Sequence, residues 1–110
     1  MIIAMADDRT DLLEQLWDEV STMPFPPAWY QREPGGQCLV TLHAVLAGSA
    51  AAVLDGPLDP RHRAHLRGRL AALARILPAF AQDPYAAHYF ETVHRMAALA
   101  ERIDRERTGD

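Results

Sequence analysis

Residues 38–60, which read CLVTLHAVLAGSAAAVLDGPLDP, decide the fold. A helix over residues 37–54 is apolar nearly all round, which is typical of a helix enclosed by its neighbours. The Asp-Gly-Pro sequence at 55–57 ends it, because glycine suits the left-handed position after a last turn and proline cannot continue a helix. Asp59 and Pro60 then provide a cap and a first residue for the next helix. The segment predicts a central helix followed by a second one.

Two further helices flank this pair. Residues 8–22 repeat apolar side chains at helical spacing and stop before Pro24. The pair Asp83 and Pro84 opens the last helix in the same way as the earlier Asp-Pro pair. It runs to about residue 103 and ends in a charged, frayed segment from 104 to 110. Candidate N-caps of the first helix are Asp7, Asp8 and Thr10.

The connections between the helices complete the predicted architecture. Pro78 is expected to kink or end the third helix, since an interior proline costs about 3 kcal/mol. Short connections after the second and third helices favour antiparallel neighbours. The fold class is therefore all-α: a four-helix, mainly antiparallel bundle in a single domain, residues 1–110, with 1–6 and 105–110 frayed.

A long loop separates the first two helices. Residues 24–36 contain four of the eight prolines and three of the eight aromatic residues. So many prolines exclude regular structure, and a solvated linker would hardly carry three large rings. We expect an ordered loop whose aromatic rings pack onto the bundle.

Composition narrows the class of protein. The apolar fraction of 49% and the charged fraction of 24% are those of a folded globular domain. A net charge of −4 argues against nucleic-acid binding, which needs a basic face. Cys38 is the only cysteine, and neither a signal peptide nor a membrane span is indicated, so we expect a cytoplasmic protein. The absence of lysine and asparagine suggests a bacterial genome of high G+C content.

The aromatic loop and the second helix form a candidate pocket of five residues. His43 lies on the apolar face of its helix and is either a core histidine, bonded to Tyr30 or a loop carbonyl, or the polar anchor of a ligand pocket. Cys38 opens the helix, where the dipole lowers a thiol pKa; the alternative is a small buried residue. It lies about 140° around the helix from His43, so the two do not pair. The pocket residues are Phe25, Trp29, Tyr30, Cys38 and His43.

A basic patch opens the third helix. Its members are Arg61, His62, Arg63 and Arg67. The arginines fan around the helix, with Arg63 and Arg67 near the core side, and no aromatic residue is interleaved for base stacking. Three interpretations stay open: pairing with the acidic faces of the first and last helices, contact with an acidic protein or a second subunit, and binding of a phosphate or carboxylate.

The last helix contains a Glu-x-x-His pattern, Glu91 and His94, that di-iron bundles use. Helical geometry puts both residues and His88 on the side and back of the helix, and a second such motif is missing. We therefore expect no metal and no cofactor.

Three functions are compatible with the sequence. The first is a non-catalytic regulator, immunity protein or accessory subunit that binds another protein or its own copy, with Ile76 and Leu99 extending the contact surface beyond the apolar stripes. The second is a small-molecule binder or minor enzyme with a pocket between residues 24–36 and the second helix. The third, a DNA-binding regulator, is disfavoured by the fanned arginines.

Overall fold

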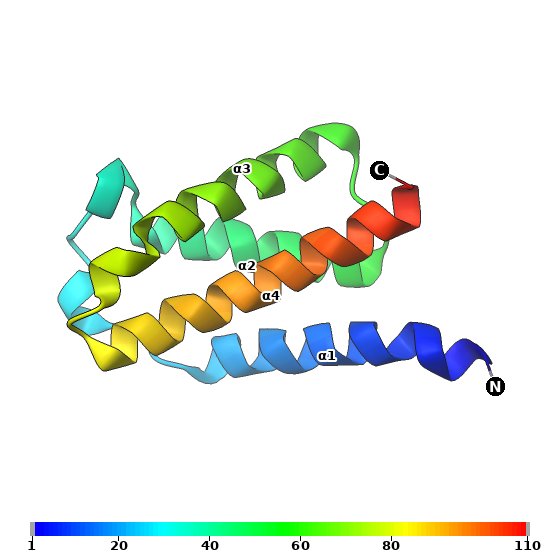
Figure 1. The fold of residues 1–110 in the computed structure, drawn as a ribbon, viewed down its shortest axis with the longest axis horizontal. Helices are drawn as coiled ribbons and strands as arrows, with labels where there is room; N and C mark the ends of the chain where they lie inside the picture. Colours follow the sequence, from blue (N-terminus) through cyan, green and yellow to red (C-terminus); the bar gives the residue numbers. More distant parts are fainter. Residues whose placement is uncertain (1, 110) are drawn as a thin grey trace.

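A computed structural model describes the backbone of residues 2–109 and the side chains of residues 9–109. Over these residues the chain forms four α-helices that run alternately in opposite directions along the long axis (Figure 1). The all-α bundle with proline-rich breaks is thereby confirmed. Its helices are α1 (Ile2–Thr22), α2 (Leu39–Asp55), α3 (Pro60–Ile76) and α4 (Pro84–Thr108), and three 3₁₀ turns are η1 (Pro27–Trp29), η2 (Pro34–Gly36) and η3 (Leu77–Phe80).

Helix α4 lies in the middle of the molecule. It packs against each of the other three helices, whereas α1 and α3 do not pack on each other along their lengths. Figure 1 shows α4 between α3 and α1, with α2 behind it. The molecule measures 46 × 27 × 18 Å, so it is flatter than a square bundle. None of the helices in residues 2–109 is long and apolar enough to cross a membrane.

The prediction for α2 is correct in part, because α2 also packs against the other three helices but is not enclosed on every side. Helix α2 buries one face, but Val40, Ala44 and Gly48 are exposed on another. A Cβ atom placed on Gly48 meets nothing within 4 Å, so no other segment of the described chain approaches there. Alanine and glycine made the helix look apolar all round, yet they gain little from burial.

Local capping explains the helix boundaries. Asp59 accepts a hydrogen bond from the backbone N–H of His62 (2.8 Å), and Asp83 accepts one from that of Ala86 (3.1 Å). Both Asp-Pro starts are confirmed. Helix α3 ends at Ile76 and continues as η3, as the proline at position 78 predicts.

The two chain ends differ from the prediction. Helix α1 begins at Ile2 rather than at residue 8. The side chains of the candidate caps Asp7 and Asp8 lie outside the described residues, and Thr10 lies inside the helix. At the other end α4 continues to Thr108 instead of fraying from Asp104. Its end is held because Arg107 donates a hydrogen bond to the carbonyl of Val53 at 2.6 Å.

The loop of residues 24–36 packs on the bundle as expected, but it contains regular turns. Pro27 and Pro34 each open a single 3₁₀ turn, because the fixed φ of proline suits a first helical position. Gly35 has φ 61° and lies so close to α3 that a Cβ atom would be 2.9 Å from a methyl group of Ile76. This contact covers Ile76, which is 7% exposed and not the surface residue that the sequence suggested.

Candidate functional site

The predicted pocket residues fall into two groups. Phe25 contacts Tyr30, with ring centroids 4.6 Å apart, and also Tyr89 at 5.7 Å. The His43 ring stacks on Tyr89, and His43 Nδ1 shares a 3.0 Å hydrogen bond with the Tyr89 hydroxyl. Two of the five predicted residues, Phe25 and His43, thus contact Tyr89, which the sequence did not indicate, and Tyr30 packs on Phe25.

Trp29 lies apart from this group. Its ring packs edge-on against Phe80 at 4.7 Å, and its Nε1 donates a hydrogen bond to the carboxylate of Asp83 at 2.9 Å. Trp29 is buried and Tyr30 is 59% exposed. The loop is therefore fastened to the start of α4 through Trp29. None of the five predicted pocket residues lines one of the surface hollows between α1 and α4, α3 and α4, or α2 and α3.

His43 is a half-buried histidine with a partner other than the one predicted. Its hydrogen bond goes to Tyr89 rather than to Tyr30 or a loop carbonyl. Burial lowers the pKa of His43, so the neutral imidazole is favoured. Burial also raises the pKa of Tyr89 to about 12, which keeps its hydroxyl protonated. The pair is a neutral, satisfied contact between α2 and α4.

Cys38 is the N-cap residue of α2 and is exposed, not buried. The hydroxyl of Thr41 donates a 3.3 Å hydrogen bond to its sulfur. This bond, helped by the backbone N–H of Thr41, lowers the pKa of the Cys38 thiol. No base from the described residues bonds the sulfur, which is therefore an exposed thiol rather than an assembled catalytic group.

The basic patch is divided between two sides of α3. Arg63 and Arg67 turn towards α4, as the helical geometry predicted, and form ion pairs with Asp104 (2.6 Å) and Glu101 (3.1 Å). Arg61 and His62 lie on the other side, beside a hollow between α2 and α3. Internal pairing therefore accounts for half of the patch.

The pair of Arg63 and Asp104 is the most buried ionic contact of the described chain. Asp104 is 1% exposed and also accepts a hydrogen bond from the backbone N–H of Leu58, while Arg63 donates one to the Leu58 carbonyl. Burial alone would raise the pKa of Asp104, but the bonds from Arg63 and Leu58 outweigh it and lower the pKa. The network ties the connection between α2 and α3 to α4.

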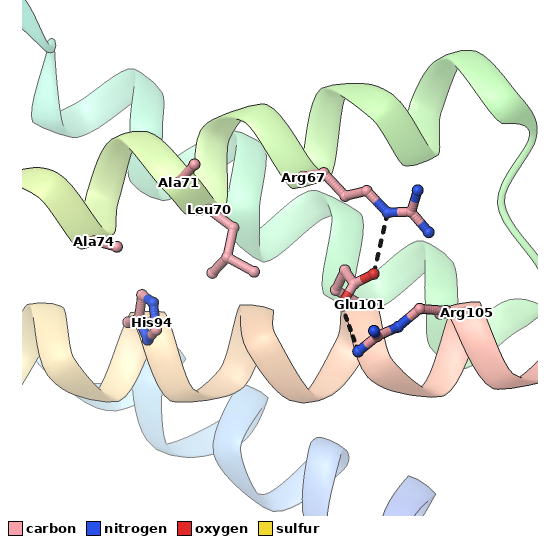
Figure 2. A pocket seen from close by; sticks show the side chains of 7 residues that line it. All are labelled: Arg67, Leu70, Ala71, Ala74, His94, Glu101 and Arg105. Atoms are coloured by element: carbon pink, nitrogen blue, oxygen red, sulfur yellow. Dashed lines mark hydrogen bonds and ion pairs between the residues drawn. The ribbon is translucent and has the colours of Figure 1, made fainter. Parts of the chain in front are cut away.

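Two hollows lie along the exposed side of α4, one on its α3 flank and one on its α1 flank. One hollow of about 640 Å³ lies between α3 and α4, and another of about 470 Å³ lies between α1 and α4; both are lined by His94. Figure 2 shows the first, in which His94 points towards α3 and Glu101 bridges two arginines. We call these two hollows the α4 groove. Its apolar lining comprises Leu12, Leu16, Leu70, Ala71, Ala74, Leu77, Ala98 and Leu99.

The groove residues correct the expectation for Leu99. Leu99 is 8% exposed and lies in the floor beside Leu16, so it does not extend an outer surface. Leu12, in contrast, is 46% exposed at the rim. His94 is half-buried, and this burial lowers its pKa. The hydropathy pattern does not predict such a groove, because the groove depends on which helices lie too far apart to pack on each other.

No metal-binding arrangement is found in the described residues. Glu91 and His88 are exposed, and His88 lies 3.9 Å from Glu19 of α1. No group of three or more histidine, cysteine, aspartate or glutamate side chains within residues 9–109 is arranged to hold a metal ion.

Comparison with known proteins adds no relative. No protein-family model matches the chain, and neither a curated protein nor a solved structure matches it. The class that the fold defines is an all-α four-helix bundle.

Proposed function

We propose that this chain is a non-catalytic binding protein that acts by holding a segment of another protein in the α4 groove. The observation that supports this proposal is the open side of α4 between α1 and α3, where two apolar hollows adjoin at His94. A groove with helical walls and an apolar floor is the geometry in which amphipathic helices dock. Ile76 is buried outside the groove and does not support the proposal, whereas Leu99 contributes only as part of the groove floor.

The charges at the rim favour an acidic partner. Glu101 bonds both Arg67 and Arg105, so its charge is already balanced. Arg95 and Arg102 line the groove and make no ion pair with residues of the described chain, and together with Glu91, which also lines it, they leave one net positive charge. We therefore propose a partner helix with an apolar stripe flanked by glutamate or aspartate. The proposal assumes a reducing cytoplasm, in which the exposed thiol of the chain stays free.

A designed peptide tests the docking chemistry. The probe is a fluorescein-labelled amphipathic helix of about 18 residues, five turns, with leucines at spacing i, i+3, i+4 and i+7 and glutamates on both flanks. A second peptide carries lysines in place of the glutamates. Fluorescence anisotropy should show binding of the acidic peptide, with the lysine peptide at least about tenfold weaker, which corresponds to about 1.4 kcal/mol.

A matched pair of variants locates the binding. Ala98→Glu introduces a carboxylate into the groove, whereas Ala64→Glu makes the same change on an exposed position of α3 that does not line it. The first should abolish peptide binding and the second should preserve it. Used as baits in lysate of the native host, the wild type and Ala64→Glu should retain a protein that Ala98→Glu loses. Equal binding by both variants, or a monomer in light scattering with neither peptide nor protein bound, contradicts the proposal.

A further inference from the structure

A hollow separate from the α4 groove, of about 520 Å³, lies between α2 and the first two turns of α3. Taking about 100° per residue, its α3 residues are on the opposite side of that helix from those that line the α4 groove. Figure 1 shows α2 behind α3 on this side. The lining residues are Ala44, Val45, Gly48 and Ser49 from α2, together with Asp59, Arg61, His62 and His65.

Ser49 is the unusual member of this lining. It is 1% exposed, and its hydroxyl has no hydrogen-bond partner among the described residues. A serine inside a helix commonly donates to the carbonyl four residues earlier, but no such bond forms here. Because buried polar groups are nearly always hydrogen-bonded, the unpartnered hydroxyl of this lining residue leaves one hydrogen bond for a ligand to complete.

The α3 side of the hollow supplies groups that bind anions. Arg61 is exposed and makes no ion pair with any residue of the described chain. His62 adds an imidazole N–H donor, whereas Nε2 of His65 accepts a 3.4 Å hydrogen bond from Arg69, which leaves only its Nδ1 side for a ligand. The positive end of the α3 dipole also lies at this point. One oxygen of Asp59 caps the helix, and its charge offsets one positive charge of the site. Because Asp59 offsets part of the positive charge of Arg61 and the helix end, the site suits a ligand with a single negative charge rather than a phosphate dianion.

The α2 side gives the ligand an apolar body. Ala44, Val45 and Gly48 offer small side chains, and a Cβ atom on Gly48 would meet nothing within 4 Å. We infer that this hollow binds a small organic monocarboxylate, with one carboxylate oxygen accepting from the Ser49 hydroxyl, the carboxylate paired with Arg61, and the short apolar chain over Gly48. A guanidinium matches a carboxylate through two parallel hydrogen bonds, which explains why one arginine is sufficient.

Titration with three small probes tests this inference on the whole chain. Sodium butyrate, followed by ¹H–¹⁵N correlation spectra, should shift the backbone amides of Gly48, Ser49 and His62. Butyramide, which has the same shape without the charge, and inorganic phosphate should each bind at least about tenfold more weakly. The inference would be overturned if butyramide or phosphate bound with the same affinity as butyrate. It would also be overturned if butyrate at tens of millimolar shifted none of these amides.

Two glycine variants place the site. Gly48→Leu fills the hollow, and Gly68→Leu adds the same side chain to an open position of α3 outside it. Butyrate binding should be lost in the first and kept in the second, with circular dichroism showing equal helix content. If Gly48→Leu does not fold, Arg61→Gln serves instead, because Arg61 is exposed and its replacement should not disturb the fold. This variant should bind butyrate at least about tenfold more weakly. Unchanged affinity in Arg61→Gln contradicts the site. Ser49→Ala should also weaken binding, and an equal affinity would remove serine from it.

Discussion

Asp104 combines two interactions in one buried carboxylate. It pairs with Arg63 and accepts the backbone N–H of Leu58, at distances of 2.6 and 2.8 Å. Removing one member of a buried pair leaves the other charge uncompensated, which costs about 3–5 kcal/mol. We therefore expect Asp104→Ala to lower the free energy of unfolding in urea by that amount.

An exposed pair provides the control. Arg9 and Glu106 form a salt bridge in which both side chains are largely open to solvent. Such pairs contribute about 0–1 kcal/mol, so Arg9→Ala should change the urea midpoint little. Equal losses in the two variants would mean that burial of Asp104 does not determine its contribution.

The role of Asp104 shows what sequence reasoning reaches at this scale. Asp104 follows Ala97 by seven residues and Ala100 by four, so it lies on the same apolar stripe of α4. The stripe was therefore a signal that the residue points inward. Its charge and nearness to the chain end suggested a frayed terminus instead, and its partner Arg63 is 41 residues away, which no local pattern specifies.

At the scale of elements, boundaries were predictable wherever a local device sets them. The two Asp-Pro starts and the end of α3 before Pro78 depend on residues within one turn of the boundary. The loop between α1 and α2 depends on distant contacts instead, and only its packing as a whole was predicted. Its attachment through Trp29 and Asp83 joins residues 54 positions apart.

This attachment predicts the behaviour of the loop. Trp29→Phe keeps an aromatic ring against Phe80 but removes the hydrogen bond to Asp83, which should lower the free energy of unfolding by about 1–2 kcal/mol. Arg32, whose guanidinium lies 4.8 Å from the Trp29 ring, should then be cleaved faster by trypsin. The control is Trp17→Phe, which loses a bond to Ala47 outside the loop and should leave that cleavage rate unchanged. Equal rates at Arg32 in Trp29→Phe and wild type would contradict the attachment.

At the scale of the molecule, the sequence predicted the number of helices but not which one is central. Helices α2 and α4 each pack against the other three helices, but α4, although its sequence is less apolar, buries the larger side chains, including Tyr89, Phe90 and Met96. The α4 groove exists because α1 and α3 do not meet. The distance between α1 and α3 depends on how the helices are placed in space, and the periodicity of the sequence carries no information about it.

Two half-buried histidines on different helices link the stability of the whole bundle to pH. Burial lowers the pKa of both His43 and His94 below the ordinary value of 6.5. Below about pH 6.5 the unfolded chain consequently binds more protons than the folded one. Their contribution to stability is complete above that pH and decreases as the pH falls through 6.5 towards the lowered native values.

We therefore expect the urea concentration at the unfolding midpoint to decrease when the pH is lowered from 7.5 to 5.5. This window lies above the ordinary value of 3.8 for an aspartate carboxyl, so Asp104 contributes little to the change. The double variant His43→Gln, His94→Gln should flatten the dependence, because glutamine keeps a polar group at both sites without a proton to gain. Urea unfolding followed by circular dichroism at the two pH values measures both effects. A wild-type midpoint that is the same at both, or a double variant as sensitive as the wild type, would show that neither imidazole resists protonation in the folded bundle.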